Sequence, residues 1–203
     1  MIKKTWSIYS PSLKLQKEIA TALNTTTVFA QILINRGYKT VTSAKLFLEN
    51  KSNQTFSPWD IKDMDKAVDL LSRAIHGKKK ITIYGDYDVD GITGTTILFQ
   101  ALEGCGGMVS YYLPDRLKEG YGLNSFAMET LAREGTCVLV TVDCGTTALK
   151  EVQTARDLGM EVVIVDHHEL LSEFPAASAF INLNYAANRC ARPWRRQTPG
   201  RSS

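Results

Sequence analysis

Acidic and histidine residues follow three short, strand-like runs of the sequence. Such residues offer the oxygen and imidazole ligands that Mn²⁺ and Mg²⁺ bind. Carboxylates gathered in one pocket repel one another, so either their pKa values rise or cations sit between them. The three runs therefore predict a divalent-metal centre. Its candidate residues are Asp86, Asp88 and Asp90 after the first run, Asp143 after the second, and Asp166, His167 and His168 after the third.

The elements that must position these residues are parallel strands joined by helices. From residue 78 onward, β-rich runs alternate with runs of helical periodicity, which is typical of right-handed βαβ units. We expect an α/β fold: a mostly parallel sheet with helices on both faces, whose strand ends meet in one crevice. The predicted strands are 80–84, 108–113, 137–142 and 161–165, and the predicted helices are 93–102, 125–133 and 147–158.

A helical segment precedes this pattern. Helices are predicted over 13–23, 28–35, 42–48 and 60–76, the last with Asp60 or Asp63 as its cap and Gly77 as its terminator. We therefore divide the chain into a helical region (1–76), a sheet domain (77–184) and a tail (185–203). The apolar stripe of the last helix comprises Met64, Ala67, Val68, Leu71 and Ile75.

The composition is that of a soluble globular protein, with 44% hydrophobic and 22% charged residues among 203. No apolar run approaches the roughly 18 residues of a membrane span, and no export signal opens the chain, so we expect a cytoplasmic protein without a membrane partner. The four cysteines form no CxxC pair, which predicts reduced thiols rather than a disulfide scaffold or a zinc finger.

The net charge of +3 arises from the tail. Residues 185–203 hold five of the 24 basic residues and no acid, leaving 19 basic against 21 acidic residues elsewhere. This abrupt change of residue usage favours a non-native or disordered tail, and the alternative is a basic arm for phosphate contacts.

Each motif also has a simpler interpretation. The Asp86–Gly91 pattern matches the first half of a calcium-binding EF-hand loop, but the required Glu is replaced by Ile97 and no helix precedes it. A strand-end Asp is also the nucleophile of haloacid-dehalogenase phosphatases, which have no use for two adjacent histidines. Asp143 alone could be a turn residue. The joint occurrence of the three strand ends is what favours a metal centre.

Residues 84–95, 143–145 and 166–168 together resemble the three successive motifs of the DHH phosphoesterases, the third of which gives that family its name. Three further stretches, 30–37, 63–68 and 113–124, resemble the bacterial single-strand-specific DNA exonucleases within the family. The resemblance extends to about residue 184, which makes 77–184 an incomplete DHH domain.

The resemblance implies a two-metal hydrolase that uses Mn²⁺ or Mg²⁺. Metal ligands would come from Asp86, Asp88 and Asp90, with Asp143 bridging the metals and His167 adding a ligand. His168 would face metal or the scissile phosphate, so Asp143 and His168 are the catalytic candidates. Asp166 would orient the site, and Arg116 in a polar loop is a candidate for phosphate contact.

The implied activity is 5′→3′ exonucleolytic hydrolysis of single-stranded DNA to 5′-mononucleotides. Implied protein partners are a single-strand-binding protein or a helicase. Family members are longer and carry a further aspartate motif and a closing domain, so we expect a truncated form with reduced or no activity. The alternatives are an inactive metal- and nucleotide-binding fragment, or a phosphoesterase for short oligonucleotides.

Overall fold

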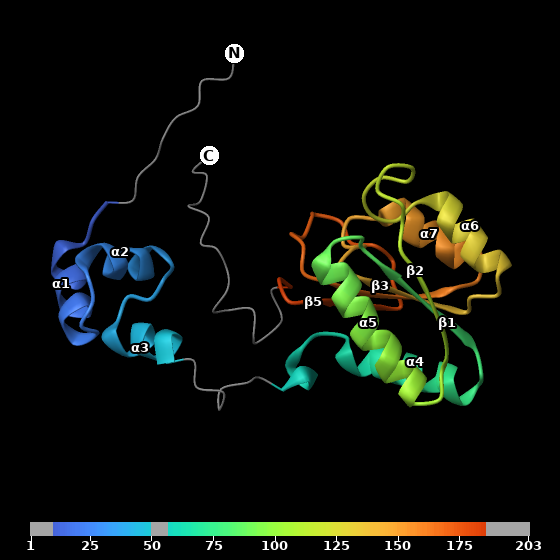
Figure 1. The fold of residues 1–203 in the computed structure, drawn as a ribbon, viewed down its shortest axis with the longest axis horizontal. Coiled ribbons are helices and arrows are strands. Elements are labelled where there is room, and N and C mark those ends of the chain that lie inside the picture. Colours follow the sequence, from blue (N-terminus) through green and yellow to red (C-terminus); the bar gives the residue numbers. More distant parts are fainter. Residues whose placement is uncertain (1–9, 50–56, 186–203) are drawn as a thin grey trace, which may run out of the picture. The chain divides into compact units, whose positions relative to one another are not determined.

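The computed structural model describes residues 10–49 and 57–185, which fall into two compact units (Figure 1). The first unit holds helices α1 (Leu13–Ala22), α2 (Thr27–Asn35) and α3 (Val41–Glu49), as the sequence predicts. Its core consists of Ile19, Ala20, Ala30, Leu33 and Ala44. The tail expected to be non-native or disordered lies outside the described residues, apart from Tyr185.

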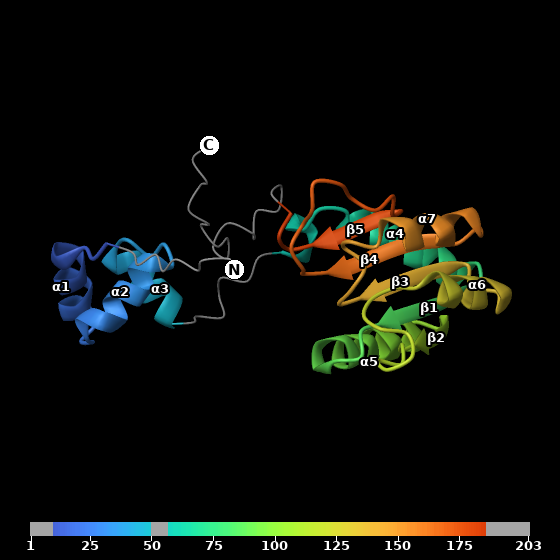
Figure 2. The ribbon, with the colours of Figure 1, turned by 90° about the horizontal axis from the view of Figure 1, so that it is seen from above.

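The second unit is built on a five-stranded sheet in which every pair is parallel (Figure 2). The strands are β1 (Lys80–Gly85), β2 (Met108–Tyr112), β3 (Val138–Val142), β4 (Glu161–Asp166) and β5 (Ala179–Asn182), in the order β2-β1-β3-β4-β5. The predicted α/β fold class is confirmed. Strand β5 has no counterpart in the sequence-based prediction.

Helices cover both faces of this sheet because side chains alternate across each strand. On β1, Ile81 and Ile83 pack in a cluster with α4 (Met64–His76) and α5 (Val89–Gly104). Tyr84 on the same strand points to the other face, in a cluster with α6 (Ser125–Arg133) and α7 (Leu149–Asp157). Strands β3 and β4 are largely buried on both faces, as the apolar runs 138–142 and 162–165 predict, whereas β2 at the edge of the sheet is partly exposed.

Helix α4 belongs to the sheet unit, so the boundary expected after residue 76 falls inside that unit. Its buried residues are Ala67, Leu70 and Ala74, whereas Val68 of the predicted stripe is 41% exposed. Asp63 stands at the helix N-terminus but caps it with no side-chain hydrogen bond. Its carboxylate instead accepts a hydrogen bond from the Phe180 N–H of β5 (3.3 Å).

Two composition-based expectations can be compared with the described residues. No helix among them is long and apolar enough to cross a membrane. Cys105, Cys137 and Cys144 are free thiols, as predicted, and Cys190 lies outside the described residues.

Candidate metal centre

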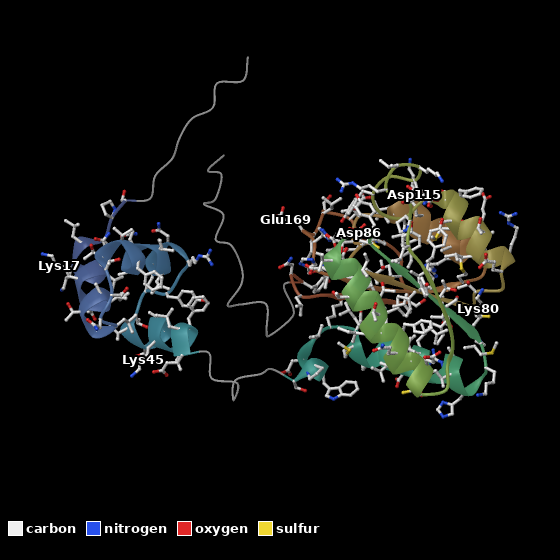
Figure 3. The ribbon with its side chains drawn as sticks, viewed as in Figure 1. Lys17, Lys45, Lys80, Asp86, Asp115 and Glu169 are labelled. Atoms are coloured by element: carbon white, nitrogen blue, oxygen red, sulfur yellow. The ribbon has the colours of Figure 1, made fainter. Side chains whose placement is uncertain are left out.

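The first motif places its carboxylates where α5 begins against the end of β1. A Cβ on Gly91 would lie 2.3 Å from the backbone oxygen of Asp86, so only glycine allows this close approach. Asp88 is the N-cap of α5, and its Oδ1 accepts hydrogen bonds from the N–H groups of Asp90 (2.9 Å) and Gly91 (3.1 Å). Asp86 is buried beside this helix start, where Figure 3 labels it.

The second motif places Asp143 directly after β3 in a left-handed backbone conformation, with φ of +61°. This conformation costs an aspartate about 1–3 kcal/mol and persists only where surrounding contacts hold it. Gly145 follows with φ of +105°, and a Cβ there would lie 2.6 Å from the Thr141 hydroxyl oxygen. The tight turn keeps the Asp143 carboxylate buried at the sheet edge.

The third motif is organised by Asp166 at the end of β4. This carboxylate accepts hydrogen bonds from the backbone N–H groups of His167 (2.7 Å), His168 (3.1 Å) and Thr146 (2.9 Å). It also accepts from the His168 ring nitrogen Nδ1 at 2.7 Å. Asp166 thus holds the backbone of both histidines and the Nδ1 edge of the His168 ring.

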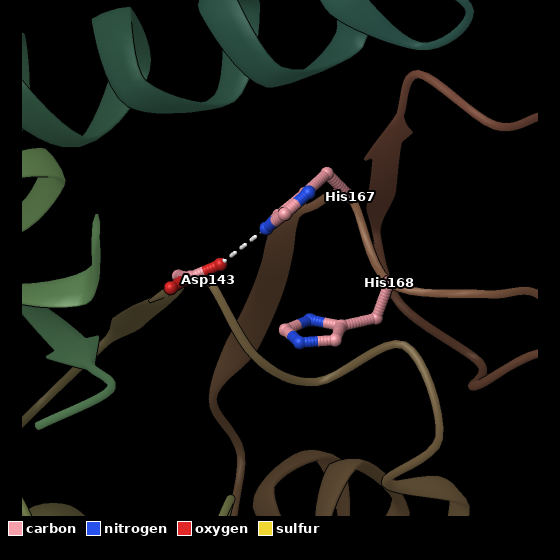
Figure 4. Close-up of side chains that lie close together, drawn as sticks. All are labelled: Asp143, His167 and His168. Atoms are coloured by element: carbon pink, nitrogen blue, oxygen red, sulfur yellow. Dashed lines mark ion pairs between the residues drawn. The ribbon is translucent and has the colours of Figure 1, made fainter. Parts of the chain in front are cut away.

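These three strand ends converge into two groups of potential ligands. Asp86, Asp88 and Asp143 form one group, and Asp143, His167 and His168 form the other, shown in Figure 4. Within each group the ligand atoms lie within 4.8 Å of one another. Asp143 is common to both groups, which is the arrangement that a carboxylate bridging two cations requires.

Two buried carboxylate oxygens in this cluster suit a cation. Asp86 Oδ1 and Asp143 Oδ1 have no hydrogen-bond partner among the described residues. His167 Nε2 does lie 2.9 Å from Asp143 Oδ1 as an ion pair, the dashed line in Figure 4. Asp86 Oδ1 has no such partner among the described residues, and a buried carboxylate oxygen left unpaired costs free energy that a divalent cation would offset. The residues present therefore fit Mn²⁺ or Mg²⁺.

Electrostatic shifts in the cluster follow from burial and from this crowding. Burial raises the pKa of Asp143, the nearby Asp88 charge adds to the rise, and His167 opposes it. Backbone N–H groups, that of Gly91 above all, lower the pKa of Asp88. The hydrogen bond to Asp166 raises the pKa of His168. The centre thus holds carboxylates of unequal basicity, with the least favourable charge on the shared Asp143.

Two predicted site residues stand apart from the ligand groups. Asp90 is exposed in the first turn of α5 and belongs to neither group found among the described residues. Arg116 is exposed in the loop after β2, and its guanidinium carbon lies 5.3 Å from the centre of the Tyr87 ring. That contact keeps Arg116 beside the first motif.

Sequence reasoning did not predict the contacts that Tyr121, Asn182 and Asn184 make with the histidines, and it treated Tyr121 only as a possible base-stacking residue. The Tyr121 hydroxyl lies 3.1 Å from His168 Nε2. The Asn182 amide nitrogen at the end of β5 donates to the His168 backbone oxygen (3.0 Å) and to the Thr146 hydroxyl (2.9 Å). The available signals were the Gly-Tyr-Gly sequence around Tyr121 and the polar residue after the short apolar run 179–181.

A cavity of about 460 Å³ opens beside His168. Its walls include Tyr121, Leu123, Leu171 and the turn from Gly145 to Ala148. Burial and the charge of Asp86 raise the pKa of Tyr121 to about 12, so its hydroxyl stays protonated at neutral pH. The cavity places space for part of a substrate next to the candidate ligands.

Comparison with known proteins agrees with this geometry. The RecJ single-stranded-DNA-specific exonuclease of Bacillus subtilis is 38% identical over 180 residues, which is 89% of this chain and 23% of that protein. The Thermus thermophilus RecJ is 40% identical over 110 residues, 53% of this chain and 16% of that protein. The chain therefore spans less than a quarter of the length of these relatives.

Solved structures show the same fold. A crystal structure of exonuclease RecJ bound to manganese superposes with a TM-score of 0.61 at 32% identity, covering 65% of this chain and 34% of that one. RecJ from Thermus thermophilus in complex with Mn²⁺ gives 0.59 at 26% identity, covering 87% and 24%. The family model described as the DHH family, N-terminal domain, matches residues 80–192. On these motifs, this fold and this match, the chain belongs to the DHH family.

Proposed function

We propose that this chain carries the metal centre of a single-stranded-DNA-specific 5′→3′ exonuclease that releases 5′-mononucleotides. The observation that carries the proposal is the position of Asp143 in both ligand groups, with buried carboxylate oxygens that lack hydrogen-bond partners. The similarity to RecJ exonucleases, including two structures solved with manganese, supports the substrate and the metal.

In this proposal Asp86, Asp88 and Asp143 hold one cation, and Asp143 and His167 hold the other. A bound pair of Mn²⁺ or Mg²⁺ ions would lower the pKa of a bridging water and neutralise charge on the phosphoryl oxygens. We assign Asp86 and Asp88 in preference to Asp90, because only they lie in a ligand group.

His168 and Arg116 act on the substrate in this proposal. Asp166 fixes the Nδ1 edge of His168, which leaves the ring exposed beside the ligand groups, where it faces the scissile phosphate. Arg116 is exposed near the first motif and supplies a cation for a neighbouring phosphate. Asp166 keeps its role of holding both histidines in place.

The proposal also includes a cellular location and a class of protein partner. We place the protein in the cytoplasm, consistent with three free thiols among the described residues. A single-strand-binding protein or a helicase is the proposed class of protein partner, and co-purification of the full chain with either would test it.

A 5′-labelled single strand incubated with the chain and Mn²⁺ tests the proposed activity. We expect release of labelled mononucleotide, its loss in Asp143→Ala, and its retention in Asp69→Ala, an exposed carboxylate on α4. Mn²⁺ binding without any release would instead support an inactive metal- and nucleotide-binding fragment. Faster hydrolysis of short oligonucleotides than of long strands would support a phosphoesterase for short substrates.

A further inference from the structure

Asp166 holds the Nδ1 edge of His168, and Tyr121 contacts the other ring nitrogen, Nε2. Its hydroxyl oxygen lies 3.1 Å from His168 Nε2, and the two rings meet edge to face with centres 6.1 Å apart. We propose that Tyr121 is a positioning residue that fixes the His168 ring through a hydrogen bond between its hydroxyl group and Nε2. The catalytic consequence rests on the proposed exonuclease function, whereas the hydrogen bond itself does not.

The other edge of the ring is held as well. Asp166 accepts from two backbone N–H groups on the same oxygen that lies 2.7 Å from His168 Nδ1, so that carboxylate is an acceptor and Nδ1 carries a proton. A hydroxyl group can both donate and accept, so Tyr121 can pair with Nε2 whether or not Nε2 carries a proton.

The loop that carries Tyr121 is held by contacts of its own. The Glu119 carboxylate accepts from the Tyr112 hydroxyl (2.6 Å), the Asp115 N–H (2.8 Å) and the Asn124 amide (3.0 Å). On the other side of Tyr121, the Gly122 backbone oxygen accepts from the Tyr84 hydroxyl (2.9 Å). Both ends of the Tyr121 segment are thus tied to the sheet.

The backbone around Tyr121 also favours this placement. Gly120 and Gly122 both have φ of +82°, a conformation that side-chain-bearing residues adopt only at a cost. A Cβ at either position would meet nothing within 4 Å, so it is the backbone conformation that requires glycine. The two glycine turns direct Tyr121 toward His168, and the hydrogen bonds to Glu119 and to the Gly122 backbone oxygen hold the rest of the loop.

With Tyr121 in place, both ring nitrogens of His168 have a partner, so rotation of the ring breaks one hydrogen bond or both. With phenylalanine in its place, only the Asp166 contact fixes the ring. We expect Tyr121→Phe to lower kcat about 10-fold, the value of one such hydrogen bond, and to leave KM nearly unchanged.

Nitrogen-15 NMR of histidine side chains in the metal-free full chain tests the hydrogen bond without any activity. The chain has three histidines, so the spectrum is simple, and His76 on α4 contacts Ser72 rather than the centre and serves as an internal reference. In wild type we expect His168 to show a protonated Nδ1. In Tyr121→Phe the Nε2 resonance should move while both His76 resonances stay.

The matched control is Tyr111→Phe on β2, whose side chain is 63% exposed and whose ring packs on Phe99. It should leave all histidine resonances unchanged. An Nε2 resonance of His168 that does not move in Tyr121→Phe overturns the proposal, and so does an Nδ1 without a proton. If Tyr121→Leu moves the resonance but Tyr121→Phe does not, ring packing alone positions His168, and the proposal is equally wrong.

Activity distinguishes this proposal from the proposed function. If wild type releases no nucleotide but the His168 signal responds to Tyr121→Phe, the exonuclease proposal fails and the hydrogen bond stands. If wild type is active and Tyr121→Phe raises KM at constant kcat, the tyrosine contributes to substrate binding instead, and the positioning role is excluded.

Discussion

Asp143 combines two features that destabilise the metal-free protein, which its ion pair with His167 offsets only in part. Its backbone is left-handed, and its carboxylate is 7% exposed. A residue that lowers the stability of the ligand-free protein is typical of functional sites, where the bound ligand supplies the missing interaction. Asp143 belongs to both ligand groups, so a substitution there should affect the stability of the metal-free protein and its metal-dependent function in opposite directions.

We predict that Asp143→Asn stabilises the metal-free chain at neutral pH, by about 1 kcal/mol, because it removes a buried charge. Burial raises the folded-state pKa of Asp143, so the folded state binds the extra proton and stability falls as pH rises from the unfolded pKa through the folded one. The gain should thus be full above the folded-state pKa and disappear below about pH 3.8, the ordinary value for Asp. Urea denaturation across this range measures it.

Mn²⁺ should reverse the difference in stability between wild type and Asp143→Asn. A ligand that binds only the folded state raises its stability with concentration, so wild type should gain thermal stability with Mn²⁺ and Asp143→Asn should gain little. Equal Mn²⁺ responses in the two proteins would show that the cation binds elsewhere.

At the scale of the residue, the sequence predicts that the histidines and the acidic residues gather at the strand ends, because each follows a recognisable apolar run, and most of them do lie in the two ligand groups. It could not separate Asp90 from Asp86 and Asp88, since that depends on where α5 begins. Nor could it find the contact between Tyr121 and His168, which joins residues 47 positions apart through loop geometry.

The elements explain why the first motif has its glycines. Helix α5 begins at Val89 rather than at residue 93 as predicted, because Asp88 caps it and Gly91 admits its first turn against β1. Hydrophobic periodicity alone underestimates the length of a helix whose first turn is rich in Asp and Gly. Strand β5 was missed for a related reason: four residues show no reliable period, and pairing with β4 decides their conformation.

We predict that Gly91→Ala destabilises the chain by about 1–3 kcal/mol and weakens Mn²⁺ binding, because the added Cβ would meet the Asp86 backbone at 2.3 Å and backbone cannot yield easily. Gly104→Ala, in the last turn of the same helix, is the matched control. A Cβ there meets nothing within 4 Å, so it should be neutral or stabilising by up to about 1 kcal/mol. Urea denaturation and Mn²⁺ titration measure both effects, and equal behaviour of the two variants would exclude the close-approach explanation.

At the scale of the whole molecule, the described residues form two units with separate hydrophobic cores. The α1–α3 unit buries a few small and medium side chains around Leu33. The sheet unit buries two larger clusters, and every candidate ligand belongs to it. Because a ligand stabilises only the cooperative unit that binds it, the two cores should respond differently to metal.

We therefore predict two thermal transitions in calorimetry of the full chain, of which Mn²⁺ raises one. Two matched Leu→Ala substitutions assign them: Leu33 in the α1–α3 core is 2% exposed, and Leu139 on β3 is fully buried. Each should cost its own unit about 2–5 kcal/mol. Leu139→Ala should lower the Mn²⁺-sensitive transition, whereas Leu33→Ala should lower only the other one. If Leu33→Ala lowers the Mn²⁺-sensitive transition by as much, the two cores unfold as one, and the metal centre depends on the helical unit for its stability.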